Sequence, residues 1–480
     1  MTAPRRMFGI QRLCNDSRRV QRGDTFVAYP GAAHDGRRFI AQAIARGARS
    51  VLWDNRNFRW NPAWRVPNLG IPQLRKRVGG IASEINGEPS AHLRVIGVTG
   101  TNGKTTCSQW VAQALNATGT CTAVIGTLGY GLRGKPRPLA NTTPDAIWLH
   151  AQLAAFVRRG ARAVSMEVSS IGLDQDRVAG VQFDTALFTN LTRDHLDYHR
   201  TLRRYRAAKA RLFGWESLRH AVINLDDAFG AELARCVPRR GLMVIGYGFG
   251  RAARVRATHL VADECGVRFD VATPWGAARI ASPALGRFNV YNLLATLAVL
   301  LTSGVGLREA AAALALLTPA PGRLQKLGGG RRPLVVVDYA HTPDALQQVL
   351  TTLRELGTDT SRLICVFGCG GGRDRGKRPL MGGIAARLAD VVYVTSDNPR
   401  DEKPLAIISD VLDGIHDVRE MLAATPDRRR AIRHAITHAR RGDIVLIAGK
   451  GHEAYQEIRG VRRPFSDAGV ARTALREWRA

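Results

Sequence analysis

Cysteine is scarce in this sequence, and no C-x-x-C pair occurs. The 480 residues include seven cysteines, an odd number at wide spacing. Cys365 and Cys369 flank a glycine turn, but no quartet of cysteine and histidine with zinc spacing accompanies them. The pattern argues against a disulfide framework and for a reducing compartment.

Long apolar runs are also lacking. The N-terminal segment MTAPRRMFGIQRL has no apolar core of the kind that a signal peptide needs. A long uncharged stretch rich in Leu, Ala and Val lies between Arg287 and Arg308, and asparagine, threonine, serine and glycine interrupt it. We therefore expect a buried helix there rather than a membrane span, and a cytoplasmic protein without membrane insertion.

Acidic residues are few relative to basic ones, since 40 Asp and Glu face 70 Lys and Arg, a formal net charge of +30. Such a charge suggests a polyanionic partner such as nucleic acid. However, the arginines are scattered, without a long basic block and with few interleaved aromatics. A composition bias combined with an anionic substrate explains the charge at least as well, so we expect no nucleic-acid partner. A basic P-loop NTPase acting on nucleic acid is kept as the alternative from a different class.

The most informative stretch is RVIGVTGTNGKTT, from Arg94 to Thr106. A short apolar run stops at glycines, and Gly103-Lys104-Thr105-Thr106 then opens a predicted helix. In this geometry backbone N–H groups point at phosphate oxygens. Lys104 can reach the outer phosphates of a triphosphate, and the Thr105 hydroxyl can bind Mg²⁺. The strict G-x-x-x-x-G-K-[ST] pattern is not met, because Val98 replaces its first glycine. A glycine turn without a ligand is the alternative, but the strand context favours binding of ATP or a relative of it.

The order of the apolar runs predicts an α/β protein of three domains, because 480 residues exceed one hydrophobic core. Residues 1–91 form a small N-terminal α/β module with an irregular tail at about 55–70. Residues 92–321 form a central ATPase domain of the P-loop type, in which strands and helices alternate around a parallel sheet. Within it, residues from about 250 to 283 alternate like antiparallel β structure and could be an insertion. Residues 322–480 form a second doubly wound, Rossmann-like sheet.

Three polar features follow predicted strands or lie on a helix of the central domain. Glu167 ends the run AVSMEV, Asp194 and His195 follow TALFTNLT, and Lys209 lies in the helix YRAAKARLF. A carboxylate and an imidazole near a triphosphate suggest Mg²⁺ ligation. Taken singly, each has an ordinary alternative: an exposed loop carboxylate, a capping or core histidine, and a solvated lysine. Their shared placement at one predicted sheet edge favours the functional interpretation.

Polar loops also follow three strands of the C-terminal domain. GCGGGRDRGKRP (368–379) is either a second anion site or a mobile loop. SDNPR (396–400) has an Asx-Pro turn as its alternative, and AGKGHE (448–453) closes a third strand. Because parallel strands end at one edge, we expect these loops to form a crevice.

Assembled in order, the motifs TGTNGKTT, NTTPD, EVSS, FTNLTRDHLDYH, YRAAKARLF, DYAHTPDA, GCGGGRDRGKRP, DNPR and AGKGHE resemble those of the Mur ligases. These are ATP-dependent, amide-forming enzymes of peptidoglycan precursor synthesis. The resemblance implies transfer of meso-2,6-diaminopimelate onto UDP-N-acetylmuramoyl-L-alanyl-D-glutamate through an acyl phosphate, because the DNPR quartet marks diaminopimelate addition in the family. A lysine-adding ligase or another Mur or folylpolyglutamate-type ligase is the nearer alternative.

The chemistry of Arg400 agrees with this resemblance. Diaminopimelate differs from lysine by a carboxylate at its far end, and a guanidinium offers a carboxylate a planar, charge-assisted fork. A buried guanidinium left without that carboxylate would be costly, so we expect lysine to be rejected strongly.

The resemblance also implies roles for individual residues. It implies an N-terminal UDP-sugar-binding domain, a central ATP-binding domain, a C-terminal amino-acid-binding domain, Mg²⁺ as cofactor and a monomer. The implied catalytic residues are Lys104, Glu167, His195 and Lys209, and the implied magnesium ligands are Thr105, Glu167, His195 and, if carbamylated, Lys209. The implied ATP contacts are Gly100, Thr101, Asn102, Gly103, Lys104, Thr105, Thr106, Asn289, Asn292, Arg323 and Asp338. The nucleotide-sugar dipeptide is assigned Ser17, Asn141, Thr142, Thr143, Ser169, Gln175 and Arg177. Diaminopimelate is assigned Arg373, Asp397, Asn398, Pro399, Arg400, Gly449 and Glu453. The chain departs from the family at Ile171, where histidine is frequent.

Overall fold

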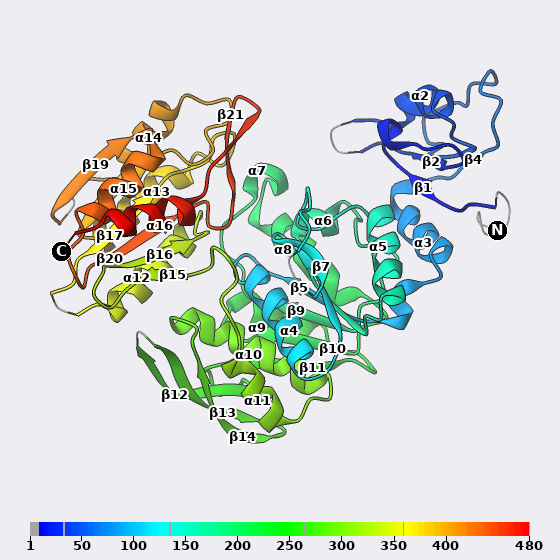
Figure 1. Ribbon diagram of the computed structural model, residues 1–480. Coiled ribbons are helices and arrows are strands. Elements are labelled where there is room, and N and C mark those ends of the chain that lie inside the picture. The colour runs from blue at the N-terminus through cyan, green and yellow to red at the C-terminus, as the bar shows by residue number, and fades with distance from the viewer. Residues whose placement is uncertain are drawn as a thin grey trace.

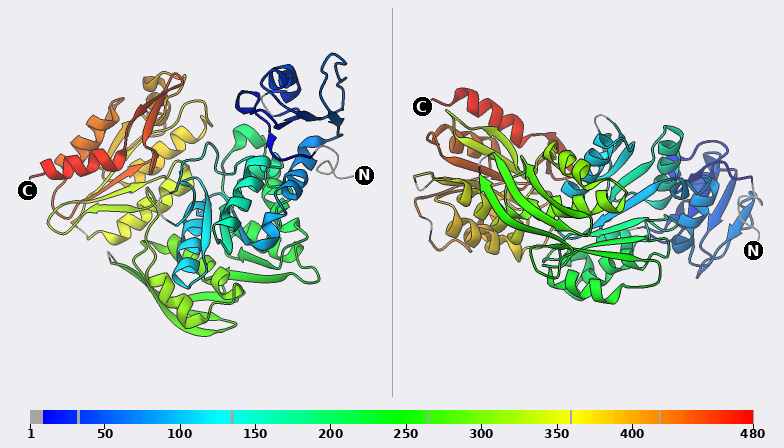
Figure 2. Two further views of the ribbon diagram at one scale, coloured as in Figure 1. Left: turned by 45° about the vertical axis from the view of Figure 1, so that its right-hand side comes forward. Right: turned by 90° about the horizontal axis from the view of Figure 1, so that it is seen from below.

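Three successive sheets organise the molecule (Figure 1). The computed structural model describes residues 9–31, 34–133, 136–263, 265–358, 360–417 and 419–479. Each sheet has helices packed against it, which confirms the predicted α/β class with a small N-terminal module, a central P-loop-type sheet and a doubly wound C-terminal sheet. The N-terminal sheet stands apart from the other two in both further views (Figure 2).

The N-terminal sheet has four parallel strands in sequential order. Its strands are β1 (Leu13–Cys14), β2 (Thr25–Ala28), β3 (Ser50–Trp53) and β4 (Asn68–Gly70), and its helices are α2 (Ile40–Ala45) and the 3₁₀ turns Ser17–Arg19 and Gly36–Phe39. The tail expected to be irregular contains β4 and an aromatic cluster in which Trp60 packs against Trp53 and Trp64. These rings pack the otherwise largely exposed connection between β3 and β4 against Trp53.

Helix α3 (Leu74–Ile85) connects this module to the central sheet. It packs along α5 (Ala146–Arg158) of the central unit. The approach is close at Gly79, where an added Cβ would lie 2.0 Å from the carbonyl oxygen of Ala179. Only a residue without a side chain allows this contact, so Gly79 fixes how the helix sits on the central unit.

The central sheet has ten strands in the order β14-β13-β12-β11-β10-β9-β5-β8-β6-β7. The strands from β5 to β11, with β7 excepted, run parallel. Their bounds are β5 (Arg94–Thr99), β6 (Thr122–Gly126), β7 (Gly129–Leu132), β8 (Ala163–Glu167), β9 (Thr185–Phe188), β10 (His220–Asn224) and β11 (Met243–Gly248).

Strands β12 (Val255–Asp263), β13 (Gly266–Thr273) and β14 (Gly276–Ser282) form the antiparallel meander that the sequence predicted. They do not form a separate insertion, because β12 pairs with β11 and continues the central sheet. The meander extends along the lower edge of the molecule in Figure 1. It packs against α10 (Arg287–Thr302) and α11 (Leu307–Ala315).

The remaining central helices cover the two faces of the sheet. They are α4 (Lys104–Ala117), α6 (Ser170–Asp174), α7 (Leu196–His199), α8 (Leu202–Ala210) and α9 (Ala228–Cys236), with 3₁₀ turns at Pro89–His92 and Arg211–Gly214. Helix α10, which lies in the uncharged stretch between Arg287 and Arg308, is buried along most of its length, as predicted. Among the described residues no helix is both long and apolar enough to span a membrane.

The C-terminal sheet has the order β15-β16-β20-β17-β18-β19, with only the edge strand β15 antiparallel. Its strands are β15 (Gln325–Gly328), β16 (Leu334–Asp338), β17 (Leu363–Phe367), β18 (Val391–Thr395), β19 (Met421–Thr425) and β20 (Ile444–Ala448). A hairpin of β21 (Tyr455–Ile458) and β22 (Val461–Pro464) follows. The helices are α12 (Pro343–Leu356), α13 (Lys377–Leu388), α14 (Pro404–Leu412), α15 (Arg428–Thr437) and α16 (Asp467–Glu477).

Apolar side chains of this sheet fill two cores, one on each face. Strands buried on both faces read as near-continuous apolar runs, which is why the runs LVVVDYA, RLICVFG, VVYVTS and DIVLIAG predict strands β16, β17, β18 and β20. Beyond the carboxyl ends of β16, β17, β18 and β20 lie the polar loops, and they face the corresponding edge of the central sheet.

Candidate active site

The loop between β5 and α4 is shaped by two glycines with left-handed backbone. Gly100 has φ +147° and Gly103 has φ +83°. A Cβ on Gly100 would lie 1.9 Å from Thr189 Oγ1, and one on Gly103 would lie 2.6 Å from Asn292 Oδ1. Both conformation and space therefore require glycine at these two positions, and the backbone N–H groups at the start of α4 are left facing the loop.

Lys104 is folded onto its own loop. Its Nζ donates to the carbonyl oxygens of Gly100 and Thr101, at 2.9 and 2.7 Å. Burial lowers the pKa of the Lys104 ammonium, while the carboxylates of Glu167 and Asp194 oppose that shift. The ammonium thus lies beside the position that phosphate oxygens take in a loop of this kind.

Glu167 is almost fully buried at the end of β8, so the exposed-loop alternative does not hold. Its carboxylate accepts from the hydroxyl of Thr105 at 3.0 Å, and from the backbone N and hydroxyl of Thr127 at 2.7 and 3.0 Å. The carboxylate is therefore aimed at the start of α4.

Lys209 is also buried, at 1% exposure, so it is not a solvated lysine. Its Nζ donates to the Gly100 carbonyl oxygen at 2.6 Å and lies 4.3 Å from the centre of the Tyr205 ring. Burial, reinforced by the positive charge of Lys104, lowers the pKa of Lys209 well below its usual value. The amine is thus held against the phosphate loop.

His195 also contacts the Tyr205 ring edge-on, with ring centroids 6.0 Å apart. It precedes α7 at the N-cap position, but its side chain makes no capping hydrogen bond. Its Nε2 is 3.5 Å from Asp194 Oδ2. Burial raises the pKa of Asp194, but His195, His341 and Lys104 outweigh burial and lower it to about 2.

The residues predicted to hold magnesium are Thr105, Glu167, His195 and Lys209. Within the described ranges, no three His, Cys, Asp or Glu side chains are grouped closely enough to hold a metal by themselves. Protein-bound Mg²⁺, however, commonly keeps waters and takes one or two carboxylates together with phosphate oxygens. The Thr105 hydroxyl and the Glu167 carboxylate, beside the phosphate loop, fit a shared site of that kind.

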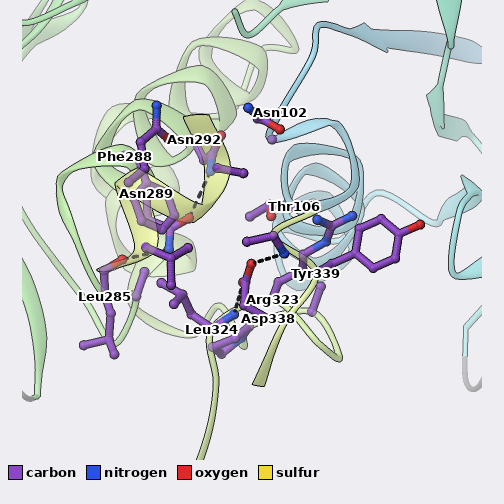
Figure 3. Close-up of a pocket in the computed structure, with 18 of the residues that line it drawn as sticks. Asn102, Thr106, Leu285, Phe288, Asn289, Asn292, Arg323, Leu324, Asp338 and Tyr339 are labelled. Atoms are coloured by element: carbon purple, nitrogen blue, oxygen red, sulfur yellow. Dashed lines mark hydrogen bonds between the residues drawn. The ribbon is translucent and has the colours of Figure 1, made fainter. Parts of the chain in front are cut away.

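A cavity of about 760 Å³ opens between the central sheet and the C-terminal sheet (Figure 3). Seven of the residues predicted to bind ATP line it: Asn102, Gly103, Thr106, Asn289, Asn292, Arg323 and Asp338. Trp110, Phe288 and Tyr339 give it aromatic surface, as is usual for small-molecule pockets.

Polar groups around this cavity form hydrogen bonds with neighbouring residues. Asn292 Nδ2 donates to Asn289 Oδ1 at 2.9 Å, as Figure 3 shows. Asp338 accepts from the backbone N of Leu324 at 2.7 Å. Arg323 lies 4.6 Å above the Tyr339 ring and donates to the Thr105 hydroxyl at 3.2 Å. The cavity therefore joins the phosphate loop directly.

Five residues predicted to bind the nucleotide-sugar dipeptide form one network beside Glu167: Thr142, Thr143, Ser169, Gln175 and Arg177. Arg177 donates to the Thr143 carbonyl oxygen at 2.9 Å and to Gln175 Oε1 at 2.7 Å. Asn141 is exposed next to this network. Ser17 is not part of it, because it lies in the N-terminal module and donates to Gln42 Oε1 at 2.7 Å.

A second cavity, of about 720 Å³, lies where the C-terminal loops face the central sheet. Six residues predicted to bind the amino acid line it: Arg373, Asp397, Asn398, Arg400, Gly449 and Glu453. Asp194 and His195 line it from the central side. Pro399 does not line it and instead occupies a turn in which its carbonyl oxygen accepts from the N of Glu402 at 3.0 Å.

Arg400 is held at this cavity by its backbone. Its N and O pair with Glu457 and Arg459 of the hairpin, and its φ is +50°. Its Nη1 donates to the Gly371 carbonyl oxygen at 2.6 Å. The other donors of the Arg400 guanidinium make no hydrogen bond to the described residues, so they are available to a ligand.

The glycine-rich loop before α13 is held by hydrogen bonds and ion pairs. Gly372 N donates to Glu402 at 2.6 Å, and the fully buried Arg378 binds both Glu402 and Asp410. Hydrogen bonding by Arg378 lowers the pKa of Glu402 to about 2. The loop therefore presents Arg373 from a fixed base.

Comparisons with known proteins agree along the whole chain. Residues 9–85 match the family model "Mur ligase family, catalytic domain", residues 98–300 the Mur ligase middle domain, and residues 322–451 the Mur ligase glutamate ligase domain. The chain belongs to the Mur ligase family.

Relatives of this Mur ligase share much of its sequence. The UDP-N-acetylmuramoyl-L-alanyl-D-glutamate–2,6-diaminopimelate ligase of Chromobacterium violaceum is 52% identical over 470 residues, covering 98% of this chain and 95% of its own. A solved structure of a ligase with the same name has a TM-score of 0.71 at 40% identity, covering 98% of this chain and 95% of that one. The ADP complex of the MurF ligase from Thermotoga maritima has a TM-score of 0.68 at 18% identity, covering 97% and 98%, and shares the fold.

Several residues of this Mur ligase site were missed in the sequence. Thr127 holds Glu167, Tyr339 and His341 line both cavities, and Lys450 is buried behind the second cavity. Three of the four lie inside motifs already recognised, DYAHTPDA and AGKGHE, so the motifs could have drawn attention to them. Thr127 carried no such signal, because its contact with Glu167 spans two strands. Nothing in the structure explains the departure at Ile171.

Proposed function

We propose that this Mur ligase joins meso-2,6-diaminopimelate to UDP-N-acetylmuramoyl-L-alanyl-D-glutamate, with ATP converted to ADP and phosphate. The printed names of its relatives and its full-length match to them support this activity. The observation that carries the proposal is the second cavity, in which the DNPR and AGKGHE loops meet Asp194 and His195 at the phosphate-loop end.

The first step brings two anions together. A γ-carboxylate oxygen of the D-glutamyl residue bonds to the γ-phosphorus of ATP, and the bond to the bridging oxygen breaks to release ADP. Lys104 and the N-terminus of α4 offset the accumulating negative charge. Magnesium, held by Thr105, Glu167, His195 and carbamylated Lys209, would supply further neutralisation of the phosphates.

The second step consumes the acyl phosphate. The diaminopimelate amine bonds to the acyl carbon, a tetrahedral intermediate forms, and breakage of the acyl–oxygen bond releases phosphate while the nitrogen loses a proton. Placement of the amine next to the acyl phosphate is the main task of the second cavity, because positioning converts a bimolecular step into a nearly unimolecular one.

The remaining assignments follow the two other clusters. The network of Thr142, Thr143, Ser169, Gln175 and Arg177 would hold the dipeptide beside Glu167, with Asn141 at its edge and Ser17 at the uridine end. The first cavity would hold adenosine, with Asn289 and Asn292 at the base, Asp338 at the ribose and Arg323 at the phosphates. Diaminopimelate would have its far carboxylate on Arg400 and its far ammonium among Asp397, Gly449 and Glu453.

The decisive experiment measures amino-acid-dependent ADP release with diaminopimelate and with lysine, for wild type and Arg400→Ala. We expect wild type to use diaminopimelate at least about 100-fold better than lysine, since a guanidinium left without its carboxylate in this partly buried site is costly. Arg400→Ala should lose diaminopimelate use and keep ATP binding.

Arg459→Ala is the matched control, because Arg459 is exposed on the same hairpin and contacts Arg400 only through its backbone. Preference for lysine in wild type would reassign the chain to a lysine-adding ligase. ADP release stimulated by RNA or DNA and indifferent to amino acids would favour the nucleic-acid alternative.

The carbamate on Lys209 and the monomeric state are part of the same proposal. The neutral amine is the form that reacts with CO₂, and the lowered pKa of Lys209 favours it. We expect a carbamate resonance in ¹³C NMR with labelled bicarbonate, absent from Lys209→Gln. Light scattering during gel filtration should give a mass near 52.3 kDa.

A further inference from the structure

Lys450 is a buried cation that does not line the second cavity but lies directly behind it. Its side chain is 0% exposed. Its Nζ donates to Asn398 Oδ1 at 3.0 Å and to Glu453 Oε2 at 2.8 Å, and lies 3.9 Å from Asp397 Oδ1. All three partners belong to the cavity lining. Burying an ammonium group is costly, so its position needs a compensating role.

The first consequence concerns the amide of Asn398. Its Oδ1 accepts from two donors, Lys450 Nζ at 3.0 Å and the N of Glu457 at 2.9 Å, and its Nδ2 donates to Glu453 Oε2 at 2.7 Å. An amide with two donors on one side cannot be turned around without losing both bonds. Lys450, together with the N of Glu457, therefore fixes the orientation of the Asn398 amide at the cavity.

The second consequence concerns Glu453. Among the described residues, Glu453 accepts two side-chain hydrogen bonds. Lys450 and Asn398 both donate to the same oxygen, Oε2. The other oxygen, Oε1, is thereby left for a ligand. An ammonium group is the natural partner of a carboxylate oxygen at this cavity.

The third consequence concerns net charge. The loops 396–400 and 448–453 together contain two carboxylates, Asp397 and Glu453, and two cations, Arg400 and Lys450. With Lys450 present the two loops are neutral, so they match a zwitterionic group without burying net charge. Without it they would carry one negative charge, which suits a lone ammonium such as the end of lysine.

We propose that Lys450 is a positioning and specificity residue of the amino-acid pocket. By orienting Asn398 and Glu453 and balancing the charge of the two loops, it makes the pocket select an amino acid whose far end is zwitterionic. This inference rests on the proposed function. It assigns part of the discrimination against lysine to a residue that never touches the substrate.

The test compares the ratio of kcat/KM for diaminopimelate to that for lysine in wild type, Lys450→Met and Lys450→Gln. We expect the KM for diaminopimelate to rise about 10- to 100-fold, as for the loss of a buried charged hydrogen bond. The KM for ATP should stay within about twofold, and the substrate ratio should fall. Lys76→Gln, which changes an exposed lysine of α3, is the control.

Charge balance is separated from a structural role by Glu453→Gln. Alone it gives the two loops one positive charge, so the substrate ratio should rise although the KM for both substrates increases. Combined with Lys450→Met it restores neutrality, and the ratio should return toward that of wild type. If Lys450 had only a structural role, its substitution would lower kcat/KM equally for both substrates. The double variant would then be less active still, with the substrate ratio unchanged.

Two outcomes separate failure of the proposed function from failure of the role assigned to Lys450. Wild type that releases no ADP with diaminopimelate overturns the proposed function, and this inference with it. Wild type that uses diaminopimelate, with a substrate ratio unchanged in Lys450→Met, Lys450→Gln and Glu453→Gln, overturns this inference alone. Should the Lys450 variants fail to fold, Glu453→Gln alone still decides, because its predicted change in ratio is upward.

Discussion

The phosphate loop of the central sheet and the amino-acid pocket of the C-terminal sheet both lie beyond the carboxyl ends of parallel strands, yet they employ buried cations differently. Lys104 donates to carbonyl oxygens of the phosphate loop itself. Lys450, Arg378 and Arg428 bind carboxylates or amides that shape the neighbouring loops. In the phosphate loop the cation has only neutral hydrogen-bond partners, whereas in the C-terminal sheet each cation already forms an ion pair with a carboxylate.

This difference separates two ways of preparing a site. Cations that contact only carbonyl oxygens gain when an anion arrives, because charge-assisted bonds are stronger than neutral ones. Cations that already hold carboxylates stabilise a preformed pocket and have little left for a ligand. We therefore expect substitutions in the phosphate loop to affect catalysis more than stability, and substitutions behind the pocket to affect stability or selectivity.

The largest effect is expected for Lys104→Met. Loss of the cation that offsets developing phosphate charge should lower kcat by about 10³- to 10⁴-fold. The melting temperature should be unchanged or higher, because burial disfavours the charged Lys104 in the unliganded protein. Steady-state kinetics and thermal unfolding measure the two quantities. A large loss of stability with little loss of kcat would remove the distinction between the two regions.

The counterpart in the C-terminal sheet is Asp467→Asn. Asp467 and Arg428 form an ion pair in which both side chains are 0% exposed, and Arg428 also holds the carbonyl oxygen of Ala448 at the start of the AGKGHE loop. Removing one partner should lower the free energy of unfolding by about 3–5 kcal/mol. Urea unfolding measures this.

Glu477→Gln serves as the control for Asp467→Asn, because its ion pair with Arg433 is exposed. Exposed pairs contribute about 0–1 kcal/mol. If both substitutions cost the same, the buried pair does not support the pocket as we describe.

An intermediate effect is expected for Asn292→Ala in the first cavity. The amide donates to Asn289 Oδ1 and accepts from the Cys107 thiol, so its loss disorders the polar side of that cavity. Nucleotide affinity should fall about 10-fold, as for one or two hydrogen bonds. Titration with a fluorescent nucleotide measures it, and an unchanged KM for diaminopimelate is the internal control.

The smallest effect concerns acid stability through Glu402. Its pKa is lowered from 4.5 to about 2 by Arg378, so the stability that it contributes is present above pH 4.5 and is lost as the pH falls toward 2. The melting temperature of wild type should therefore fall more steeply over that interval than that of Glu402→Gln. Parallel slopes would show that the tether of the glycine-rich loop adds nothing to stability.

Much of the site was predictable because its residues follow apolar strands. β5, β8, β9, β16, β17, β18 and β20 each appear in the sequence as a short apolar run, and parallel strands bring their ends together. Hence Glu167 and His195 could be placed at one edge of the central sheet, and Arg400 in a crevice of the C-terminal sheet, before any coordinates. The catalytic and binding roles assigned to them remain predictions.

What escaped prediction depends on contacts between distant segments. The pairing of β12 with β11 made the expected insertion part of the central sheet, since edge pairing leaves no local pattern. Lys450 looks like any loop lysine until the hairpin and the DNPR loop enclose it. Thr127 is one of many threonines after a strand.

The sequence by itself determined the glycine turn before α4, the order of the strands along the chain and the ordered motifs, because these depend on local backbone freedom and on the period of apolar residues. Only the tertiary structure decided that Lys209 and Lys450 are buried, that two cavities meet at Tyr339 and His341, and that Ser17 stands apart from the dipeptide network. Burial and charge pairing are properties of packed surroundings, which distant segments supply together.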